Sequence, residues 1–284
     1  MKNENISKAL QNVKSEKPLT LGITNNVTIN DCTNAMLAVG GTAVMVDDDI
    51  DAADFAAVSR GLVINIGKLN ELQIKVIKES CEAADKNNTP ITIDPVGISV
   101  TKRRQDLVKY LLKNNKISCI RGNMSEIKAV GDLMNITQNS TTGAVGVDAN
   151  ETDLIVEDNL KENGQIVKNI AKSLNLVIVA SGPIDLISDG NKVYSIENGD
   201  EMMPLITGSG CMLSIIVGTY ITVNNPLIGA IAATGHMGIA GEKASKYVKD
   251  NDFGTGTFRT MLIDNLYKIT PKDLENEINL KEII

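Results

Sequence analysis

A glycine-rich turn in the last third of the chain carries the strongest chemical signal in the sequence. Residues 207–211 (TGSGC) stand directly before the apolar run Met212-Leu213-Ser214-Ile215-Ile216. Glycines let the backbone N–H groups of a turn converge, and a helix that begins here adds the positive end of its dipole. The turn is not a P-loop, because no Lys-Ser/Thr pair follows it. The pattern therefore indicates a phosphate site, and a plain helix cap is the alternative that the turn alone leaves open.

Charged side chains stand at the ends of two predicted strands. Asp94 ends one of them, and Arg121 and Glu126 follow the next. Because the carboxyl ends of parallel strands meet at one edge of a sheet, Asp94 and Glu126 could hold Mg²⁺ there, directly or through water. Arg121 could pair with a phosphate in a forked geometry. The alternatives are that Glu126 only stabilises the start of a helix and that Arg121 forms a surface ion pair.

Amide side chains are concentrated near the start of the chain. Residues 23–25 (ITN) and 30–34 (NDCTN) border apolar runs, and helix capping explains only some of these side chains. They predict a polar ligand pocket. His236 is the only histidine, so a Ser/His/Asp triad is not expected, and we interpret His236 as a packing or surface residue.

Short apolar runs alternate with amphipathic stretches and must position these residues. Runs without polar alternation are typical of parallel strands covered by helices on both faces. The predicted strands are 43–46, 61–66, 91–94, 117–120 and 176–180, and a hairpin pairs 185–188 with 193–196. The predicted helices are 51–60, 71–86, 103–113, 211–223 and 227–247. The sequence therefore predicts an α/β fold with a mostly parallel central sheet, in a single domain over residues 1–284.

Composition narrows the class of protein. The net charge of −7 argues against nucleic acid or an anionic membrane as the main partner. Cys32, Cys81, Cys119 and Cys211 form no CxxC pair, so neither a zinc site nor a disulfide framework is indicated. No stretch has the apolar length of a membrane span or of a signal peptide, and a cytoplasmic location is expected.

The motifs, taken in order, resemble the hydroxyethylthiazole kinase family of the ribokinase-like superfamily. The resemblance runs nearly from end to end. It rests on Ile23-Thr24-Asn25 with Asn30 and Asn34, Val44-Met45, Asn65-Ile66-Gly67, Asp94-Pro95-Val96-Gly97, residues 121–126 (RGNMSE), Gly146-Val147-Asp148, Ser181-Gly182 with Asp185, Ser188-Asp189-Gly190, residues 207–211 and residues 254–258 (GTGTF).

The resemblance implies a ribokinase-like layered fold and phosphorylation of the hydroxyl of 4-methyl-5-(2-hydroxyethyl)thiazole by ATP, for thiamine synthesis. It implies that Met45, Gly208 and Asn25 contact the thiazole alcohol, and that Arg121 and Ser181 contact ATP. Mg²⁺ would lie near Asp94 and Glu126. It also implies a homotrimer with substrate sites between subunits.

In this reading the backbone N–H groups from Gly208 through Ser209 and Gly210 to Cys211 hold the moving phosphoryl group. Cys211 stands where related sugar kinases place an aspartate base, and a helix N-terminus can lower a thiol pKa, so Cys211 could accept the hydroxyl proton. The sequence departs from the family at Lys68, where Thr is usual, and at Ser99-Val100, where Gly-Ala is usual. The alternative is an ATP-dependent lyase of the NAD(P)H-hydrate dehydratase type, but its related glycine turn usually ends in Asp.

Overall fold

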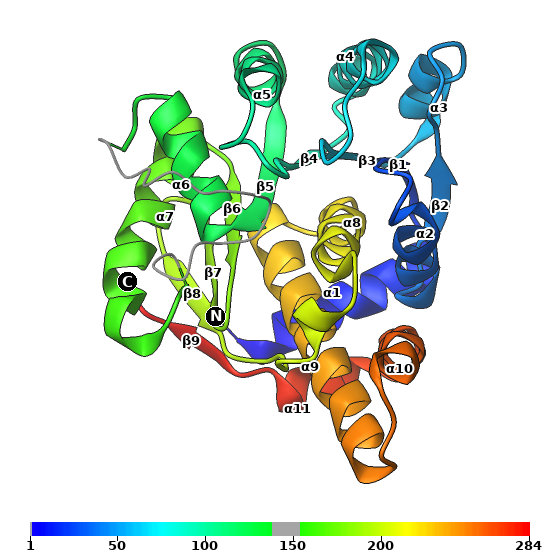
Figure 1. Cartoon of the computed structure of the whole chain (residues 1–284), viewed down its shortest axis with the longest axis vertical. Coiled ribbons are helices and arrows are strands. Elements are labelled where there is room, and N and C mark those ends of the chain that lie inside the picture. The colour runs from blue at the N-terminus through cyan, green and yellow to red at the C-terminus, as the bar shows by residue number, and fades with distance from the viewer. Residues whose placement is uncertain (1, 138–153) are drawn as a thin grey trace.

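The computed structural model describes residues 2–137 and 154–284. Within these ranges one sheet of nine strands runs in the order β2-β1-β3-β4-β5-β6-β7-β8-β9 (Figure 1). Neighbouring strands are parallel from β2 to β6, and β7, β8 and β9 each pair antiparallel with the strand before them. The strands are β1 (Leu19–Ile23), β2 (Thr42–Met45), β3 (Gly61–Asn65), β4 (Ile91–Asp94), β5 (Ile117–Asn123), β6 (Val177–Ser181), β7 (Asp185–Ser188), β8 (Val193–Ile196) and β9 (Leu280–Glu282).

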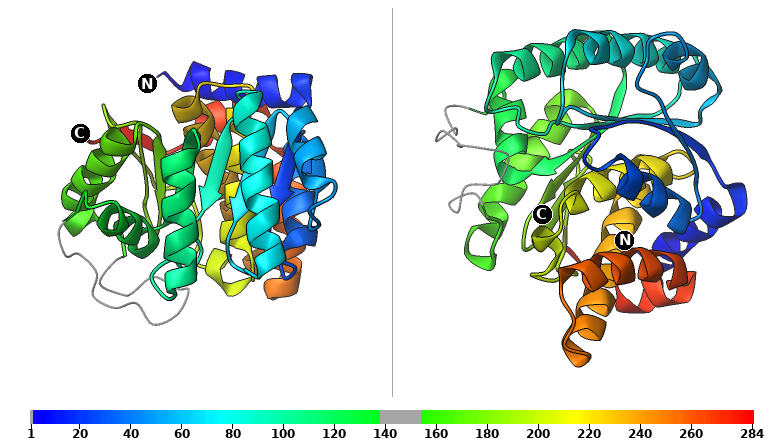
Figure 2. Two further views of the ribbon diagram at one scale, coloured as in Figure 1. Left: turned by 90° about the horizontal axis from the view of Figure 1, so that it is seen from above. Right: turned by 45° about the vertical axis from the view of Figure 1, so that its right-hand side comes forward.

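Helices cover both faces of the sheet. One face packs against α3 (Ala52–Val58), α4 (Glu71–Lys86), α5 (Lys102–Asn114), α6 (Met124–Leu133) and α7 (Leu160–Leu174). The other packs against α1 (Asn3–Glu16), α2 (Ile29–Ala38), α8 (Ser209–Ile221), α9 (Pro226–Asp250), α10 (Thr255–Lys268) and α11 (Pro271–Glu277). Figure 2 shows α4 and α5 side by side along their face. Each face of the sheet thus has its own hydrophobic core, because successive strand residues point to opposite sides.

The predicted α/β class and the mostly parallel sheet are confirmed. The helix over 71–86, the strand over 91–94 and both strands of the hairpin have the predicted bounds, and the other predicted elements differ by a few residues. One difference matters for the site: β5 continues to Asn123, so Arg121 lies within the strand instead of after it. In the part of the chain that the structure describes, no helix is long and apolar enough to cross a bilayer.

Helix α8 lies exceptionally close to the middle of the sheet. A Cβ on Gly218 would stand 2.0 Å from Val63 Cγ2 of β3, and a Cβ on Gly61 would stand 2.3 Å from Thr222 Cγ2. Neither distance can be met by a real side chain, so glycine is required on both sides of this contact. The contact fixes where α8 begins relative to the ends of the central strands.

His236 is a packing residue, one of the two roles predicted for it. It is buried in α9, where Nδ1 accepts a hydrogen bond from the Tyr220 hydroxyl (2.6 Å) and Nε2 donates to the Leu266 carbonyl oxygen (3.0 Å). Burial lowers its pKa to about 3, so the ring is neutral in the folded protein. The unfolded chain binds this proton near pH 6.5. The histidine therefore favours folding above that pH, and its contribution is lost as the pH falls toward 3.

We expect replacement of His236 by Gln to weaken the pH dependence of stability. Between pH 6.5 and about 4, the advantage of the wild type over His236→Gln should shrink by about 1.4 kcal/mol per pH unit, the effect of one proton bound only by the unfolded state. Urea unfolding at pH 7.5, 6.0 and 5.0 measures this difference. Carboxyl groups titrate in both proteins and cancel, so a difference that stays constant with pH would contradict a neutral buried ring.

Candidate active site

The predicted site residues meet where β3, β4, β5 and β6 end and α8 begins. Helix α8 starts at Ser209, with Gly208 as its N-cap at φ 82°, a left-handed conformation that favours glycine. No side chain caps this end of the helix in the described structure. The first N–H groups of a helix have no partner within it, so those of Ser209, Gly210 and Cys211 are available to an anion.

The glycine turn is enclosed from two sides. A Cβ on Gly208 would lie 2.5 Å from Thr28 Cγ2, and a Cβ on Gly210 would lie 2.8 Å from Arg121 Nη1. The Arg121 guanidinium therefore lies directly against the start of α8. A single positive side chain and the N-terminus of the helix thus act on the same point, as a phosphate site requires.

Arg121 belongs to a second group of residues that lies on the sheet. Its Nε donates to Ser181 Oγ at the end of β6 (3.2 Å). Asp185, in the first position of β7, accepts from the Gly182 N–H (3.2 Å). Burial raises the pKa of Asp185 to about 6, and the nearby Arg121 opposes the rise. The structure thus brings together Arg121 and Ser181, which the sequence assigned to ATP.

Asn65 is the centre of a hydrogen-bond network that the sequence did not assign to the site. Its Oδ1 accepts from Asn25 Nδ2 (3.3 Å) and from the Gly67 N–H (2.9 Å). Its Nδ2 donates to Asp94 Oδ2 (2.7 Å) and to Cys211 Sγ (3.2 Å). Asn65 was visible only as part of the Asn-Ile-Gly motif. All its hydrogen-bonding capacity is used, so it holds Asn25, Asp94 and Cys211 in one arrangement.

Asp94 and Glu126 differ in how far the protein satisfies them. Asp94 Oδ2 also accepts from the Ser214 hydroxyl (2.7 Å), whereas its buried Oδ1 has no partner among the described residues. Glu126 accepts the Gly97 N–H on Oε1 (3.0 Å) and the Asn123 N–H on Oε2 (2.9 Å). The helix-capping alternative for Glu126 is therefore realised, as a capping box with Asn123 at the start of α6.

The two carboxyl groups nevertheless fit a cation. Burial raises the pKa of both, that of Glu126 to about 7, and the charge of Asp94 contributes to the shift at Glu126. A divalent ion would relieve this repulsion and give Asp94 Oδ1 its missing partner. In the described part of the chain no three His, Cys, Asp or Glu residues form a metal cluster, so water and phosphate oxygens would have to complete the coordination, as Mg²⁺ allows.

The expected lowering of the Cys211 pKa is wrong. Burial raises the pKa of the thiol, and the Asp94 carboxylate raises it further, against opposing contributions from neighbours that include Arg121. Desolvation disfavours the thiolate more strongly than the helix terminus favours it. Cys211 therefore lies in the network as a neutral thiol at neutral pH.

Two further residues were missed by the sequence reasoning. A Cβ on Gly22 of β1 would stand 2.6 Å from Met45 Sδ, so this glycine makes room for the Met45 side chain at the end of β2. Arg104 donates to the carbonyl oxygens of Ile66 (3.3 Å) and Gly67 (2.9 Å) and so holds the turn that follows Asn65. Gly22 could have been found from the sequence, because a glycine within an apolar strand often marks a close approach of another group.

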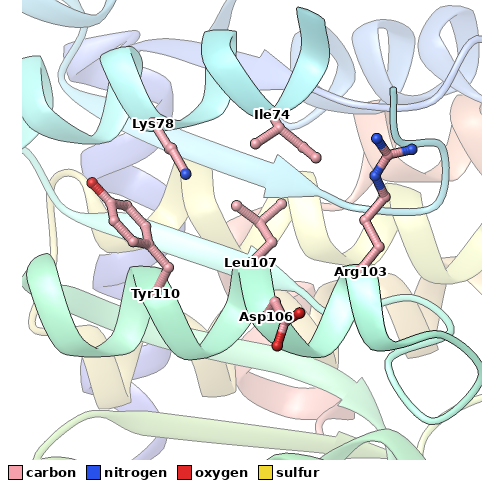
Figure 3. Close-up of a pocket in the computed structure, with 6 residues that line it drawn as sticks. All are labelled: Ile74, Lys78, Arg103, Asp106, Leu107 and Tyr110. Carbon is pink, nitrogen blue, oxygen red and sulfur yellow. The ribbon is translucent and has the colours of Figure 1, made fainter. Parts of the chain in front are cut away.

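Lys68 and Val100, the departures from the family pattern, are exposed. Gly146-Val147-Asp148 lies outside the described residues. A pocket of about 460 Å³ between α4 and α5 contains none of the predicted site residues (Figure 3). It is lined by Ile74, Lys78, Arg103, Asp106, Leu107 and Tyr110.

Comparison with known proteins agrees with this geometry. Residues 10–272 match the hydroxyethylthiazole kinase family. The chain belongs to that family. It is 47% identical to the hydroxyethylthiazole kinase of Methanobrevibacter smithii, over 98% of this chain and 96% of that protein. It is 39% identical to that of Clostridium beijerinckii, over 98% and 97%.

Solved structures give the same assignment for the fold. The hydroxyethylthiazole kinase protein of Pyrococcus horikoshii superposes with a TM-score of 0.83 at 28% identity, covering 98% of this chain and 99% of that one. A ribokinase-like superfamily protein of Enterococcus faecalis superposes with a TM-score of 0.60 at 14% identity, which concerns the fold alone. The predicted family and its ribokinase-like fold are confirmed, and the lyase alternative finds no support in the family match.

We expect Gly210→Ala to impair phosphate handling without harming the fold. The new methyl group meets the far end of the Arg121 side chain, which can move, while alanine stabilises a helix by about 1 kcal/mol relative to glycine. Activity and ATP binding should fall while the melting temperature holds or rises.

Gly256→Ala is the matched control, because Gly256 has the same second position in α10 and its Cβ would have no neighbour within 4 Å. This variant should gain similar stability and keep the wild-type rate. Equal activity of the two variants would show that Arg121 does not act at the glycine turn.

Proposed function

We propose that this chain transfers the γ-phosphoryl group of ATP to the primary hydroxyl of 4-methyl-5-(2-hydroxyethyl)thiazole, in the formation of thiamine diphosphate. The observation that carries the proposal is the Arg121 guanidinium lying against Gly210, at a helix N-terminus that no side chain caps. The names of relatives at 39% and 47% identity support the choice of acceptor.

The proposed mechanism is positioning combined with charge neutralisation. Phosphoryl transfer passes through a loose transition state whose charge is spread over the equatorial oxygens. The N–H groups of Ser209, Gly210 and Cys211 would donate to these oxygens, and Arg121 would hold the transferred or the β-phosphate. Arg121 is kept in place by Ser181, so it would meet the nucleotide already oriented.

The acceptor is proposed to lie on the other side of the glycine turn. Met45, Gly208 and Asn25 would contact the thiazole alcohol. Asn25 is held by Asn65, with its Nδ2 3.8 Å from Cys211 Sγ. Because the thiol is neutral, we assign Cys211 to the wall of the site, with its backbone N–H as the catalytic donor. A loose transition state needs little deprotonation of the acceptor early in the transfer.

Mg²⁺ is the proposed metal. Asp94, through its unpartnered Oδ1, and Glu126 would hold it, directly or through water. When bound, the ion supplies positive charge that neutralises phosphate oxygens. The chain holds each carboxylate in place separately: Asn65 and Ser214 donate to Asp94, while the N–H groups of Gly97 and Asn123 donate to Glu126.

We also propose a homotrimer with substrate sites between subunits. Exposed apolar side chains flank β2, the edge strand of the sheet, in the sequence: Val27 is 73%, Ile50 83% and Val58 66% exposed. Exposed apolar surface of this kind is typical of protein interfaces. The four cysteines of the chain form no disulfide, which supports the proposal of a cytoplasmic location.

The proposal predicts ADP formation only when the thiazole alcohol and a divalent metal are both present. A coupled ADP assay with the thiazole alcohol, hydroxymethylpyrimidine, a hexose and hydrated NADH measures the choice of acceptor. We expect turnover on the thiazole alcohol. Strong turnover of the hexose or of hydrated NADH, with none on the thiazole, would refute the proposal.

Asp94→Asn provides a test of the metal site that leaves the fold intact. The amide oxygen can still accept from Asn65 and Ser214, and the new amide group replaces an oxygen that has no partner. Stability should be retained, whereas the Mg²⁺ concentration needed for half-maximal rate should rise by at least about 10–100-fold.

Glu126→Gln is compared with Asp94→Asn because both oxygens of Glu126 accept a backbone N–H. In glutamine the side-chain NH₂ group would face one of these donors, the N–H of Gly97 or that of Asn123. The substitution should lower the free energy of unfolding by about 1–3 kcal/mol. An unchanged Mg²⁺ titration for Asp94→Asn would exclude Asp94 as a metal-binding residue.

A further inference from the structure

An ion pair joins the buried Asp31 carboxylate of α2 to the partly exposed Arg259 of α10, outside the residues assigned to the reaction. Asp31, in the first turn of α2, is only 4% exposed. Arg259 of α10 donates through Nε to Asp31 Oδ1 (3.0 Å) and Oδ2 (2.9 Å), and through Nη2 again to Oδ1. Arg259 is the only cation paired with Asp31 in the described ranges. Such a fork fixes direction as well as distance, so it locks the first turn of α2 onto α10.

The same turn of α2 forms the wall of the acceptor side. Thr28, the N-cap of the helix, presses its methyl group against Gly208. The Thr28 N–H donates to the Asn25 carbonyl oxygen (3.2 Å), and Asn25 Oδ1 accepts from the Val27 N–H (3.1 Å). A movement of this turn would therefore displace both Asn25 and the contact that closes the glycine turn on one side.

We propose that Arg259 and Asp31 are positioning residues for the acceptor half of the active site. The pair touches no reacting atom and acts by holding the first turn of α2 at the distance from Gly208 that the acceptor requires. This inference rests on the function proposed above.

The two halves of the site have different supports, which makes the inference specific. Arg121, Ser181 and Asp185 lie on β5, β6 and β7, and no hydrogen bond joins them to α2 or α10 in the described part of the chain. Loosening α2 should therefore affect the acceptor and leave the nucleotide almost untouched. A general loss of stability would not separate the two substrates.

Arg259→Met tests this, because methionine keeps an unbranched apolar stem and removes every side-chain donor. We expect the KM for the thiazole alcohol to rise, up to the roughly 10²-fold that a misplacement of about 1 Å can cause, while the KM for ATP changes little. Arg259→Lys keeps the charge but lacks the forked geometry, so its KM for the thiazole alcohol should lie between those of the wild type and Arg259→Met. Lys268→Gln, which removes an exposed i,i+4 pair with Asp264 in the last turn of the same helix, is the matched control and should behave as the wild type.

The double variant Arg259→Met/Asp31→Asn separates positioning from stability. Arg259→Met alone leaves a buried unpaired carboxylate and should lower the melting temperature. Adding Asp31→Asn removes that charge, so the melting temperature should recover while the KM for the thiazole alcohol stays high. If the melting temperature and the KM for the thiazole alcohol both recover in the double variant, the pair is only structural. A rise in the KM values for both substrates in Arg259→Met would show the same. The wild type is assayed alongside, and its failure to use the thiazole alcohol would refute the proposed function. If the wild type is active but Arg259→Met does not raise the KM for the thiazole alcohol more than the KM for ATP, this inference alone is refuted.

Discussion

The contact between α8 and β3 determines the geometry of the whole site. Gly218 and Gly61 let the helix lie on the strand at a distance that no larger residue permits. Because α8 is a rigid rod, this contact sets the position of its first turn above the carboxyl ends of β3, β4 and β5. Ser214, one turn into the helix, reaches Asp94 on β4, and Gly210 meets Arg121 on β5. Packing in the C-terminal half of α8, at Gly218 and Thr222, thus sets the position of the glycine turn together with the turn's own contacts to Thr28 and Arg121.

The site holds more carboxyl groups than cationic side chains, and burial disfavours the charged form of each carboxyl. Asp94, Glu126 and Asp185 are grouped around one guanidinium, that of Arg121, and burial raises the pKa of each carboxyl. An anionic nucleotide would be repelled if all three carboxylates were charged and no cation accompanied it. This balance of charges supports the proposal that a divalent cation binds together with the nucleotide.

The sequence predicted the chemistry at the strand ends better than the contacts that organise it. Asp94 and Arg121 could be found because each ends or follows an apolar run at one edge of a parallel sheet, and the glycine turn because it directly precedes an apolar helix. Ser181 came from the family resemblance. The Asn65 network could not, since its partners are far apart in sequence: Asn25 and Cys211 are separated by 186 residues. The Cys211 pKa was predicted in the wrong direction for the same reason. The helix terminus is a local feature that the sequence shows, whereas burial and the nearby Asp94 charge come from tertiary packing.

The division of the site between sheet and helix has a consequence for specificity. The proposed nucleotide half is built on β5 to β7, where main-chain pairing fixes Arg121 opposite Val179 and Asn123 opposite Ser181. The proposed acceptor half depends on the first turn of α2, whose contacts with the rest of the site are made by side chains: Thr28 on Gly208, Asn25 on Asn65 and Asp31 on Arg259. Side-chain contacts can change by substitution without disturbing a ladder of backbone hydrogen bonds. The acceptor could therefore change through α2 while the machinery for phosphoryl transfer stays in place.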